Sequence, residues 1–325
     1  MSVLVYAENS AGKFKKSTFE AISYGYSVAQ QLNTSLTVLS IGDVANDELS
    51  KTAAFGASKI MNVANDKLKS FVNMAYAAVI AEAVKSDDAT VVILPASFSG
   101  KGLAPRLAVK LEAGYVDGAI ALPTTANGFT VRKGAFSGKA FADVTLTSER
   151  KVITLVPNSY KVNENPQAIN IVEFAPVVKD TDFAAMVKEI VRASDKVSLP
   201  EAEIVVSGGR GLKGPENWGM VEELANLLGA ATACSKPVSD AHWRPHSEHV
   251  GQTGIAVSPN LYIAIGISGA IQHLAGVSSS KVIVVINKDP EAPFFKAADY
   301  GIVGDAFEVV PKLIEAVKEF KAVNA

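Results

Sequence analysis

The chain contains very little cysteine, little net charge and no long apolar run. Its one cysteine, Cys234, excludes an internal disulfide framework and any cysteine-ligated iron–sulfur cluster built within this chain. The formal net charge of −2 provides no field that would attract nucleic acid or an anionic membrane surface. No stretch approaches the roughly 20 apolar residues that a membrane-spanning helix needs. We therefore expect no nucleic-acid partner and no direct insertion into a membrane.

The scarcity of cysteine also fits a reducing compartment. The first predicted strand begins at Val3, so we expect no signal or transit peptide ahead of it. These features favour a soluble protein of bacterial cytoplasmic type, with a processed mitochondrial form as the alternative.

Length and pattern predict an α/β fold with two domains. The 325 residues, 48% of them hydrophobic, suffice for two domains with separate cores. In the first half, apolar strands alternate with helices, which predicts a mostly parallel sheet with helices on its faces. From Tyr115 onward, short strands separated by glycine and charged residues predict antiparallel strands, including a hairpin over 129–146. A helix is expected over 180–192.

The polar segment 193–203 contains Pro200 and lacks periodicity, so it is the best candidate for a linker. We therefore predict an N-terminal α/β domain over 1–198 and a C-terminal parallel-sheet domain over 199–325. Each predicted strand of the second domain is followed by polar or glycine-containing residues. These strands end at Ser207, Ser235, Ser268, Asn287 and Asp305. Because the carboxyl ends of parallel strands share one edge of a sheet, these turns predict a ligand site there.

The stretch 250–290 carries the strongest prediction of such a site. A buried-strand pattern turns into a short helical pattern beside Ser268 and Gly269, and backbone N–H groups at such a turn suit an anion. The VGQTG turn at 250–254 adds an amide and a hydroxyl that suit the edge of a flavin ring.

Three glycines further upstream suggest a different cofactor. Gly209, Gly211 and Gly214 match G-x-G-x-x-G between a predicted strand and a predicted helix, which is the context of a dinucleotide-binding turn. The acid expected after the next strand is absent, and Lys236, which suits a 2′-phosphate, stands there. An NADP-dependent oxidoreductase is therefore the alternative function, and a non-redox nucleotide-binding module is a third.

Three of the four histidines lie close together, at His242, His246 and His249 beside Glu248. Pro245 argues against one helix face presenting two of them, and no H-E-x-x-H spacing is present. We interpret them as exposed loop histidines and predict no metal site.

Four stretches of the second half, in this order, closely resemble the alpha subunits of electron transfer flavoproteins. They are VSGGRGLKGPEN (206–217), VGQTG (250–254), LYIAIGISGAIQHLAG (261–276) and INKDPEAPFFKAADYGIVGD (286–305). The N-terminal half resembles the family more loosely, through the VLVYAE start and the SGKGLAPRLA loop.

The resemblance implies that the C-terminal domain binds FAD. The residues that match the family's FAD contacts are Arg210, Ser235, Lys236, Val250, Gly251, Gln252, Thr253, Ser268, Gly269, Ala270, Ile271, Gln272, His273, Asn287, Asp305 and Ala306. It also implies that Thr253 lies near the flavin N5 and His273 near the C2 carbonyl edge. A positive or donor group at that edge stabilises the reduced flavin. Lys236 replaces a common arginine of the family, which keeps the charge but loses the planar fork, so the difference concerns the flavin potential and not flavin binding.

The resemblance further implies electron carriage without substrate chemistry, so no catalytic residue is expected. Electrons would come from dehydrogenases such as acyl-CoA dehydrogenases and pass toward a membrane quinone oxidoreductase. The family works as a heterodimer whose beta subunit binds AMP.

Overall fold

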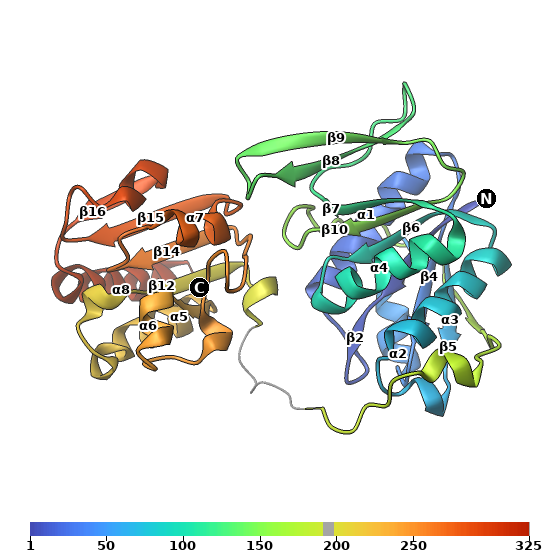
Figure 1. Cartoon of the computed structure of the whole chain (residues 1–325), viewed down its shortest axis with the longest axis horizontal. Helices are drawn as coiled ribbons and strands as arrows, with labels where there is room; N and C mark the ends of the chain where they lie inside the picture. Colours follow the sequence, from blue (N-terminus) through green and yellow to red (C-terminus); the bar gives the residue numbers. More distant parts are fainter. Residues whose placement is uncertain (191–197, 325) are drawn as a thin grey trace. The chain divides into compact units, whose positions relative to one another are not determined.

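The computed structural model describes residues 1–190 and 198–324. Residue contacts divide the chain into two compact units, which are drawn together in Figure 1. One unit comprises Met1–Ala135 and Ala140–Arg192, and the other Phe136–Lys139 and Ala193–Ala325. Residues 193–197 of the expected linker lie outside the described residues, a 3-10 turn forms at Leu199–Glu201, and the domain boundary at 198/199 stays a prediction.

The first unit is built on a nine-stranded sheet with the order β11-β5-β4-β1-β6-β10-β7-β8-β9. Its strands are β1 (Ser2–Ala7), β4 (Ser35–Ile41), β5 (Lys59–Val63), β6 (Ala89–Pro95), β7 (Gly114–Ala119), β8 (Phe129–Ala135), β9 (Ala140–Leu146), β10 (Lys151–Leu155) and β11 (Asn170–Glu173). A separate two-stranded ribbon joins β2 (Asn9–Ser10) to β3 (Lys13–Phe14). All pairs from β11 to β7 are parallel, and β7–β8 and β8–β9 are antiparallel.

Helices cover both faces of this sheet because its central strands are apolar on both sides. The helices are α1 (Lys16–Gln31), α2 (Asn46–Ser50), α3 (Asn73–Ser86) and α4 (Phe98–Leu111). The inner side of α1 packs with Val3 and Val5 of β1 in one core. Helices α3 and α4 pack with Leu4 of the same strand in a second core. Alternate residues of one strand therefore support two opposite layers.

The second unit has a five-stranded, wholly parallel sheet with the order β13-β12-β14-β15-β16. Its strands are β12 (Ile204–Gly208), β13 (Ala231–Cys234), β14 (Leu261–Ile265), β15 (Val282–Asn287) and β16 (Tyr300–Val303). Its helices are α5 (Gly219–Leu228), α6 (Lys236–Asp240), α7 (Ile271–Val277) and α8 (Ala306–Val323). The two cores of this unit lie on the two faces of the sheet, one with α5 and α8 and the other with α7.

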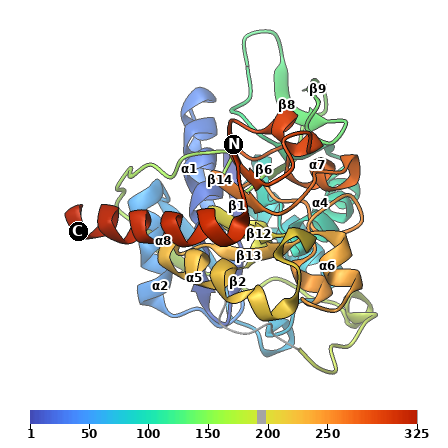
Figure 2. The ribbon, with the colours of Figure 1, turned by 90° about the vertical axis from the view of Figure 1, so that its left-hand side faces the viewer.

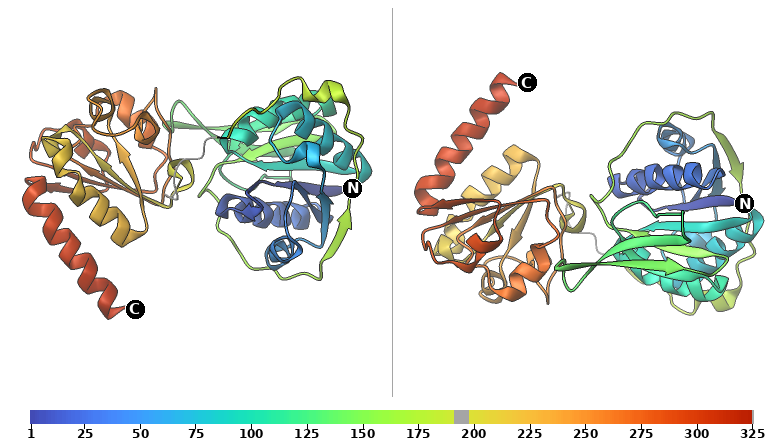
Figure 3. Two further views of the ribbon diagram at one scale, coloured as in Figure 1. Left: turned by 90° about the horizontal axis from the view of Figure 1, so that it is seen from below. Right: turned by 90° about the horizontal axis from the view of Figure 1, so that it is seen from above.

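Helices α5 and α8 lie side by side on their face of the sheet in both views of Figure 3. Only Ala306, Val310 and Ile314 of α8 are buried. The helix continues past the strands, as Figure 2 shows, and Phe320 and Val323 near its end are exposed.

The predicted fold class is confirmed: a mostly parallel sheet with antiparallel strands at one end is followed by a purely parallel sheet. The helix expected over 180–192 is wrong, because only a 3-10 turn forms at Asp180–Phe183 and residues 184–190 are not helical. Met186 is 81% exposed, so the expected apolar face has nothing to pack against. Residues 191 and 192 lie outside the described residues. Among the helices that the structure describes, none combines the length and the apolar character needed to cross a membrane.

Candidate functional site

A cavity of about 580 Å³ lies at the carboxyl ends of the strands in the second unit. Strand β12 is flanked by β13 and β14, so the chain moves to one side of β12 and then to the other. The connections that follow the β12 and β14 turns, to β13 and to β15, therefore lead to opposite sides and leave a crevice, which is where open α/β sheets bind ligands. The cavity is lined by Arg210, Gly211, Ser235, Lys236, Pro237, Asp240, His249, Val250, Gly251, Gln252, Thr253, Gly266, Ile267, Ser268, Gly269, Ala270, Gln272, His273, Asn287 and Asp289.

The turns after β12 and β14 approach each other backbone to backbone. Gly211 N–H donates to Gly266 O at 3.0 Å. A Cβ atom on Gly209 would lie 2.2 Å from Gly266 O, and one on Gly211 would lie 2.6 Å from Gly266 Cα. Gly266 itself has φ +63°, which favours glycine. The first two glycines of the G-x-G-x-x-G pattern therefore serve a close backbone contact.

The same pattern does not lead directly into a helix. Two 3-10 turns, Arg210–Leu212 and Pro215–Asn217, intervene before α5 begins at Gly219. A dinucleotide-binding turn places the helix N-terminus against the pyrophosphate. The start of α5 is displaced along the chain from the glycines, so this geometry weakens the NADP alternative.

The VGQTG turn is fastened to helix α7 through its backbone. Gln252 N–H donates to Gln272 O at 2.7 Å, and Val250 N–H donates to the Cys234 carbonyl at 3.0 Å. Gly276 of α7 packs on Gly251, where an added Cβ would lie 2.6 Å from the Gly251 Cα and N atoms. Because the backbone makes these attachments, the side chains of Gln252 and Thr253 stay exposed on the cavity.

The turn after β14 is shaped by a second glycine and an asparagine. Gly269 has φ +82°, and a Cβ there would lie 2.5 Å from the Cβ of Phe294. Asn287 Nδ2 donates to Ile267 O at 3.0 Å, and its Oδ1 accepts from Asp289 N–H. The Asn287 side chain thus braces the turn from the neighbouring strand.

His273 is the most strongly perturbed titratable group on the cavity. It is 6% exposed, and its Nε2 lies 3.0 Å from the Tyr262 hydroxyl. Burial lowers the pKa of His273 to about 4; the Val250 backbone opposes this lowering and His249 adds to it. His273 is therefore neutral at pH 7 in the protein without a bound cofactor.

This assignment predicts a pH-dependent stability of the second unit. Between pH 6.5 and 4 the unfolded chain protonates this imidazole and the folded chain does not, so the free energy of unfolding falls as pH decreases. We expect His273→Gln to lose that part of the pH dependence, while contributions of carboxylates remain in both proteins. Urea unfolding followed by tryptophan fluorescence measures it, since Trp218 and Trp243 both lie in the second unit. Identical pH profiles for the two proteins would contradict a neutral, buried His273.

Two cations, Arg210 and Lys236, and two carboxylates, Asp240 and Asp289, also line the cavity. Arg210 follows β12, and Lys236 begins α6 after β13. Lys236 Nζ lies 3.3 Å from Asp240 Oδ2, and both side chains are more than half exposed. Exposed pairs of this kind contribute little to stability, about 0–1 kcal/mol, so Lys236 can exchange Asp240 for an anionic ligand at small cost.

The structure brings thirteen of the sixteen residues predicted to bind FAD onto this one cavity. Ile271 is 70% exposed and does not line it. Asp305 caps α8 by accepting from Phe307 N–H at 3.0 Å, and Ala306 is buried in the core below that helix. The contacts of these three residues with FAD stay predictions that rest on the resemblance alone.

Sequence reasoning missed several residues that line the cavity. They are Gly211, Pro237, Asp240, His249, Gly266, Ile267 and Asp289. Gly211 belongs to the predicted dinucleotide pattern, and the prediction of an exposed loop position is wrong for His249. His249 is only 2% exposed and its Nδ1 has no hydrogen-bond partner within the described part of the chain. The one indication in the sequence that His249 lines the cavity is its position directly before the VGQTG turn.

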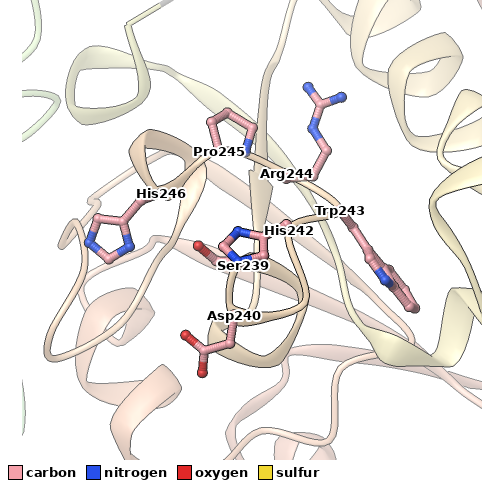
Figure 4. A pocket seen from close by; sticks show the side chains of 7 residues that line it. All are labelled: Ser239, Asp240, His242, Trp243, Arg244, Pro245 and His246. Carbon is pink, nitrogen blue, oxygen red and sulfur yellow. The ribbon is translucent and has the colours of Figure 1, made fainter.

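The rest of the histidine-rich segment borders a second hollow of about 500 Å³, shown in Figure 4. Its lining side chains do not converge, and His246 and Trp243 point to opposite sides in this view. Among the described residues, no group of three or more histidine, cysteine, aspartate or glutamate side chains could hold a metal ion.

Arg244 anchors this segment to helix α5. Its guanidinium contacts Glu248 at 2.6 and 2.8 Å and Glu222 at 3.0 Å, and it lies over the Trp218 ring. The segment that ends in VGQTG is therefore fixed at both ends, by this cluster and by α7. Cys234 lies beside it, and burial raises the pKa of its thiol to about 12, so it stays protonated.

The residues present fit a phosphate-bearing cofactor with a planar ring. Glycine backbone forms the cradle wherever a Cβ atom would collide, and Arg210 and Lys236 border it together with the carboxylates of Asp240 and Asp289. Buried apolar residues such as Val250 and Ile267 lie beside the neutral imidazole of His273. Cofactor sites in proteins combine such an apolar lining with a few polar groups that fix orientation.

Comparison of the sequence with known proteins finds relatives that match nearly the whole chain. Residues 3–179 match the family model of the electron transfer flavoprotein domain, and residues 198–278 match that of the electron transfer flavoprotein FAD-binding domain. The electron transfer flavoprotein subunit alpha of Bacillus subtilis (strain 168) is 40% identical over 99% of this chain and 98% of its own length. The corresponding subunit of Thermoanaerobacterium thermosaccharolyticum is 36% identical over 98% of both chains. The mitochondrial subunit alpha of Dictyostelium discoideum is 36% identical over 98% of this chain and 92% of its own. The chain therefore belongs to the family of electron transfer flavoprotein alpha subunits.

Proposed function

We propose that this chain binds FAD in the cavity of its second unit and carries electrons between redox partners, with no substrate chemistry of its own. One observation carries the proposal: thirteen residues matched to FAD contacts from sequence lie on a single cavity at the switch point of a parallel sheet. The family's FAD-binding domain covers the same region, residues 198–278.

The chemistry that FAD supplies when bound is reversible electron transfer at its flavin ring. The protein's part is to hold and orient it. Arg210 and Lys236 provide charge for the phosphates, and the backbone of VGQTG and of Ser268–Gly269 approaches closely because glycine leaves room. Gln252 and Thr253 offer an amide and a hydroxyl to the ring.

His273 takes part as a neutral group. The resemblance implied a positive or donor group near the ring, and the depth of burial favours the uncharged imidazole. Its influence on a bound flavin is then through its position and not through a charge, and the charged side chains on the cavity are Arg210, Lys236, Asp240 and Asp289.

By the same family membership we propose a heterodimer with a beta subunit that binds AMP. Electrons would arrive from dehydrogenases of the acyl-CoA dehydrogenase type and leave toward a membrane quinone oxidoreductase. The relatives named above are alpha subunits, which supports the partner beta subunit, and the donors and acceptor follow from the resemblance.

The first test removes one phosphate-binding charge. Arg210→Ala is expected to raise the FAD dissociation constant about 10- to 150-fold, since a charge-assisted hydrogen bond contributes about 1.5–3 kcal/mol. The measurement is flavin content after gel filtration together with fluorescence titration of the FAD-free protein.

Lys318→Ala is the matched control, because Lys318 pairs with Glu223 on α5, away from the cavity lining. It removes the same charge from the same unit and should keep wild-type FAD affinity. Equal flavin content in the Arg210 variant and the wild type would remove Arg210 from the site.

A further inference from the structure

Tyr262 is a polar side chain placed in the apolar core below the cavity. It lies within β14, is fully buried and packs in the core that also holds Val250 and Phe294. Burying a hydroxyl without a partner costs roughly 1–3 kcal/mol, so its hydrogen bond is informative. That bond is the 3.0 Å contact with His273 Nε2.

The protons of this contact follow from the groups around it. Burial raises the pKa of the Tyr262 phenol well above its usual range, so the hydroxyl keeps its proton. Ser207 of β12 is also buried, and it faces the phenol closely enough to oppose that rise, although its Oγ makes no hydrogen bond of good geometry among the described residues. A Tyr262 hydroxyl that keeps its proton can donate it to His273 Nε2.

A neutral imidazole that accepts at Nε2 carries its proton on Nδ1. The Val250 backbone raises the pKa of His273, which is the effect of a carbonyl that faces a ring N–H. Nδ1 is the nitrogen left for this proton; it is buried and makes no hydrogen bond within the described residues. His249 is the other titratable group that acts on the ring, and it disfavours a charged His273.

We propose that Tyr262 is a positioning residue of the cavity: its hydroxyl fixes His273 as the neutral Nδ1–H tautomer and holds the imidazole against β14. This hydrogen bond joins helix α7 to the sheet below the cavity. The tautomer is a property of this chain alone, and only its effect on cofactor affinity rests on the proposed FAD site.

The test observes the imidazole nitrogens directly. The full chain is labelled with ¹⁵N-histidine, which gives four residues to assign, and His273→Gln identifies the signals of His273. In the wild type we expect a protonated Nδ1 and an acceptor Nε2 for His273. In Tyr262→Phe, which keeps the ring and removes only the hydroxyl, we expect the proton to redistribute toward Nε2, with the signals of His242 and His246 unchanged.

Tyr300→Phe is the control, since Tyr300 lies on the neighbouring strand β16 and is 67% exposed. It should leave the His273 tautomer unchanged. An Nε2–H tautomer in the wild type, or the same tautomer in wild type and Tyr262→Phe, would overturn the proposal. If Tyr262→Phe does not fold, the wild-type spectrum still tests the proposal, because an Nε2–H tautomer of His273 would overturn it.

A second measurement, the affinity for FAD, separates this inference from the proposed function. With FAD present, Tyr262→Phe should raise the FAD dissociation constant about 2- to 10-fold, the equivalent of one neutral hydrogen bond. A changed tautomer in a protein that never binds FAD would leave the Tyr262 inference standing and refute the proposed function. An unchanged tautomer with normal FAD binding would do the reverse.

Discussion

Replacing Gly276 by alanine is expected to weaken FAD binding strongly, although Gly276 does not line the cavity. Its Cβ would lie 2.6 Å from both the Cα and the N of Gly251, so the contact is with backbone that no rotamer change relieves. Helix α7 and the VGQTG turn must then separate. Overpacking of this kind costs about 1–3 kcal/mol, which corresponds to about a 5- to 150-fold higher FAD dissociation constant where the strain falls on the bound state.

Helix propensity alone predicts that replacing Gly276 by alanine would raise stability, not that it would weaken FAD binding. Alanine within a helix is favoured over glycine by about 1 kcal/mol, so an unobstructed position would gain stability. Gly219 at the start of α5 is such a position, with no atom within 4 Å of an added Cβ. We expect Gly219→Ala to keep FAD affinity and wild-type or higher stability. Equal FAD affinity of the Gly276 and Gly219 variants would show that the turn is not held by this contact.

Replacing Arg244 by methionine is expected to destabilise the second unit by roughly 3 kcal/mol, near the lower end of the range for breaking a buried ion pair. Arg244 is 17% exposed, and its partner Glu248 is 13% exposed, so the variant leaves a nearly buried carboxylate without its cation. Glu222 is 40% exposed and regains water, which moderates the loss. Urea unfolding monitored by tryptophan fluorescence measures the change in the second unit, where both tryptophans lie.

Lys236→Met provides the comparison at an exposed pair. Lys236 and Asp240 are both more than half exposed, so this change should cost less than about 1 kcal/mol. The double variant Arg244→Met/Glu248→Met should recover most of the lost stability, because it removes the unpaired charge as well. A loss below about 1 kcal/mol in Arg244→Met would mean that the cluster does not anchor the histidine-rich segment.

The parallel sheets could be predicted because their strands are buried on both sides and appear as continuous apolar runs, as in β1 and β14. The polar residues at the ends of β13, β14 and β15 then predicted that Ser235, Ser268 and Asn287 lie on one edge of the sheet. The hydrophobic pattern of the strands could not show which loop residues also line the cavity at that edge. Asp240 and His249 reach the cavity because Arg244 and α7 fix the segment between them.

Two local patterns were misleading for physical reasons. The apolar spacing over 180–192 suits a helix, but Met186 and Ile190 are exposed in the structure, and a short helix without a buried face is marginal in water. The G-x-G-x-x-G match has the right order of strand and helix. Pro215 begins a 3-10 turn before α5, and the distance from glycines to helix decides the function of the motif.

Asp305 illustrates a third limit. The residue follows a strand, as the pattern requires, and its carboxylate is already engaged as the N-cap of α8 and lies 3.8 Å from Lys213 Nζ. A polar residue at a strand end serves either the ligand or the following helix, and sequence alone does not distinguish the two uses.

The most direct test of the FAD site is equilibrium binding to the full chain, produced together with its beta subunit and compared for two ligands. We expect the purified protein to carry flavin absorbance, to lose it when FAD is stripped, and to regain it on addition of FAD in a one-to-one ratio to this chain. NADPH should neither bind to the stripped protein nor compete with FAD. A colourless protein that binds NADPH and not FAD would contradict the account. It would instead favour an NADP-dependent oxidoreductase that uses the glycine turn after β12.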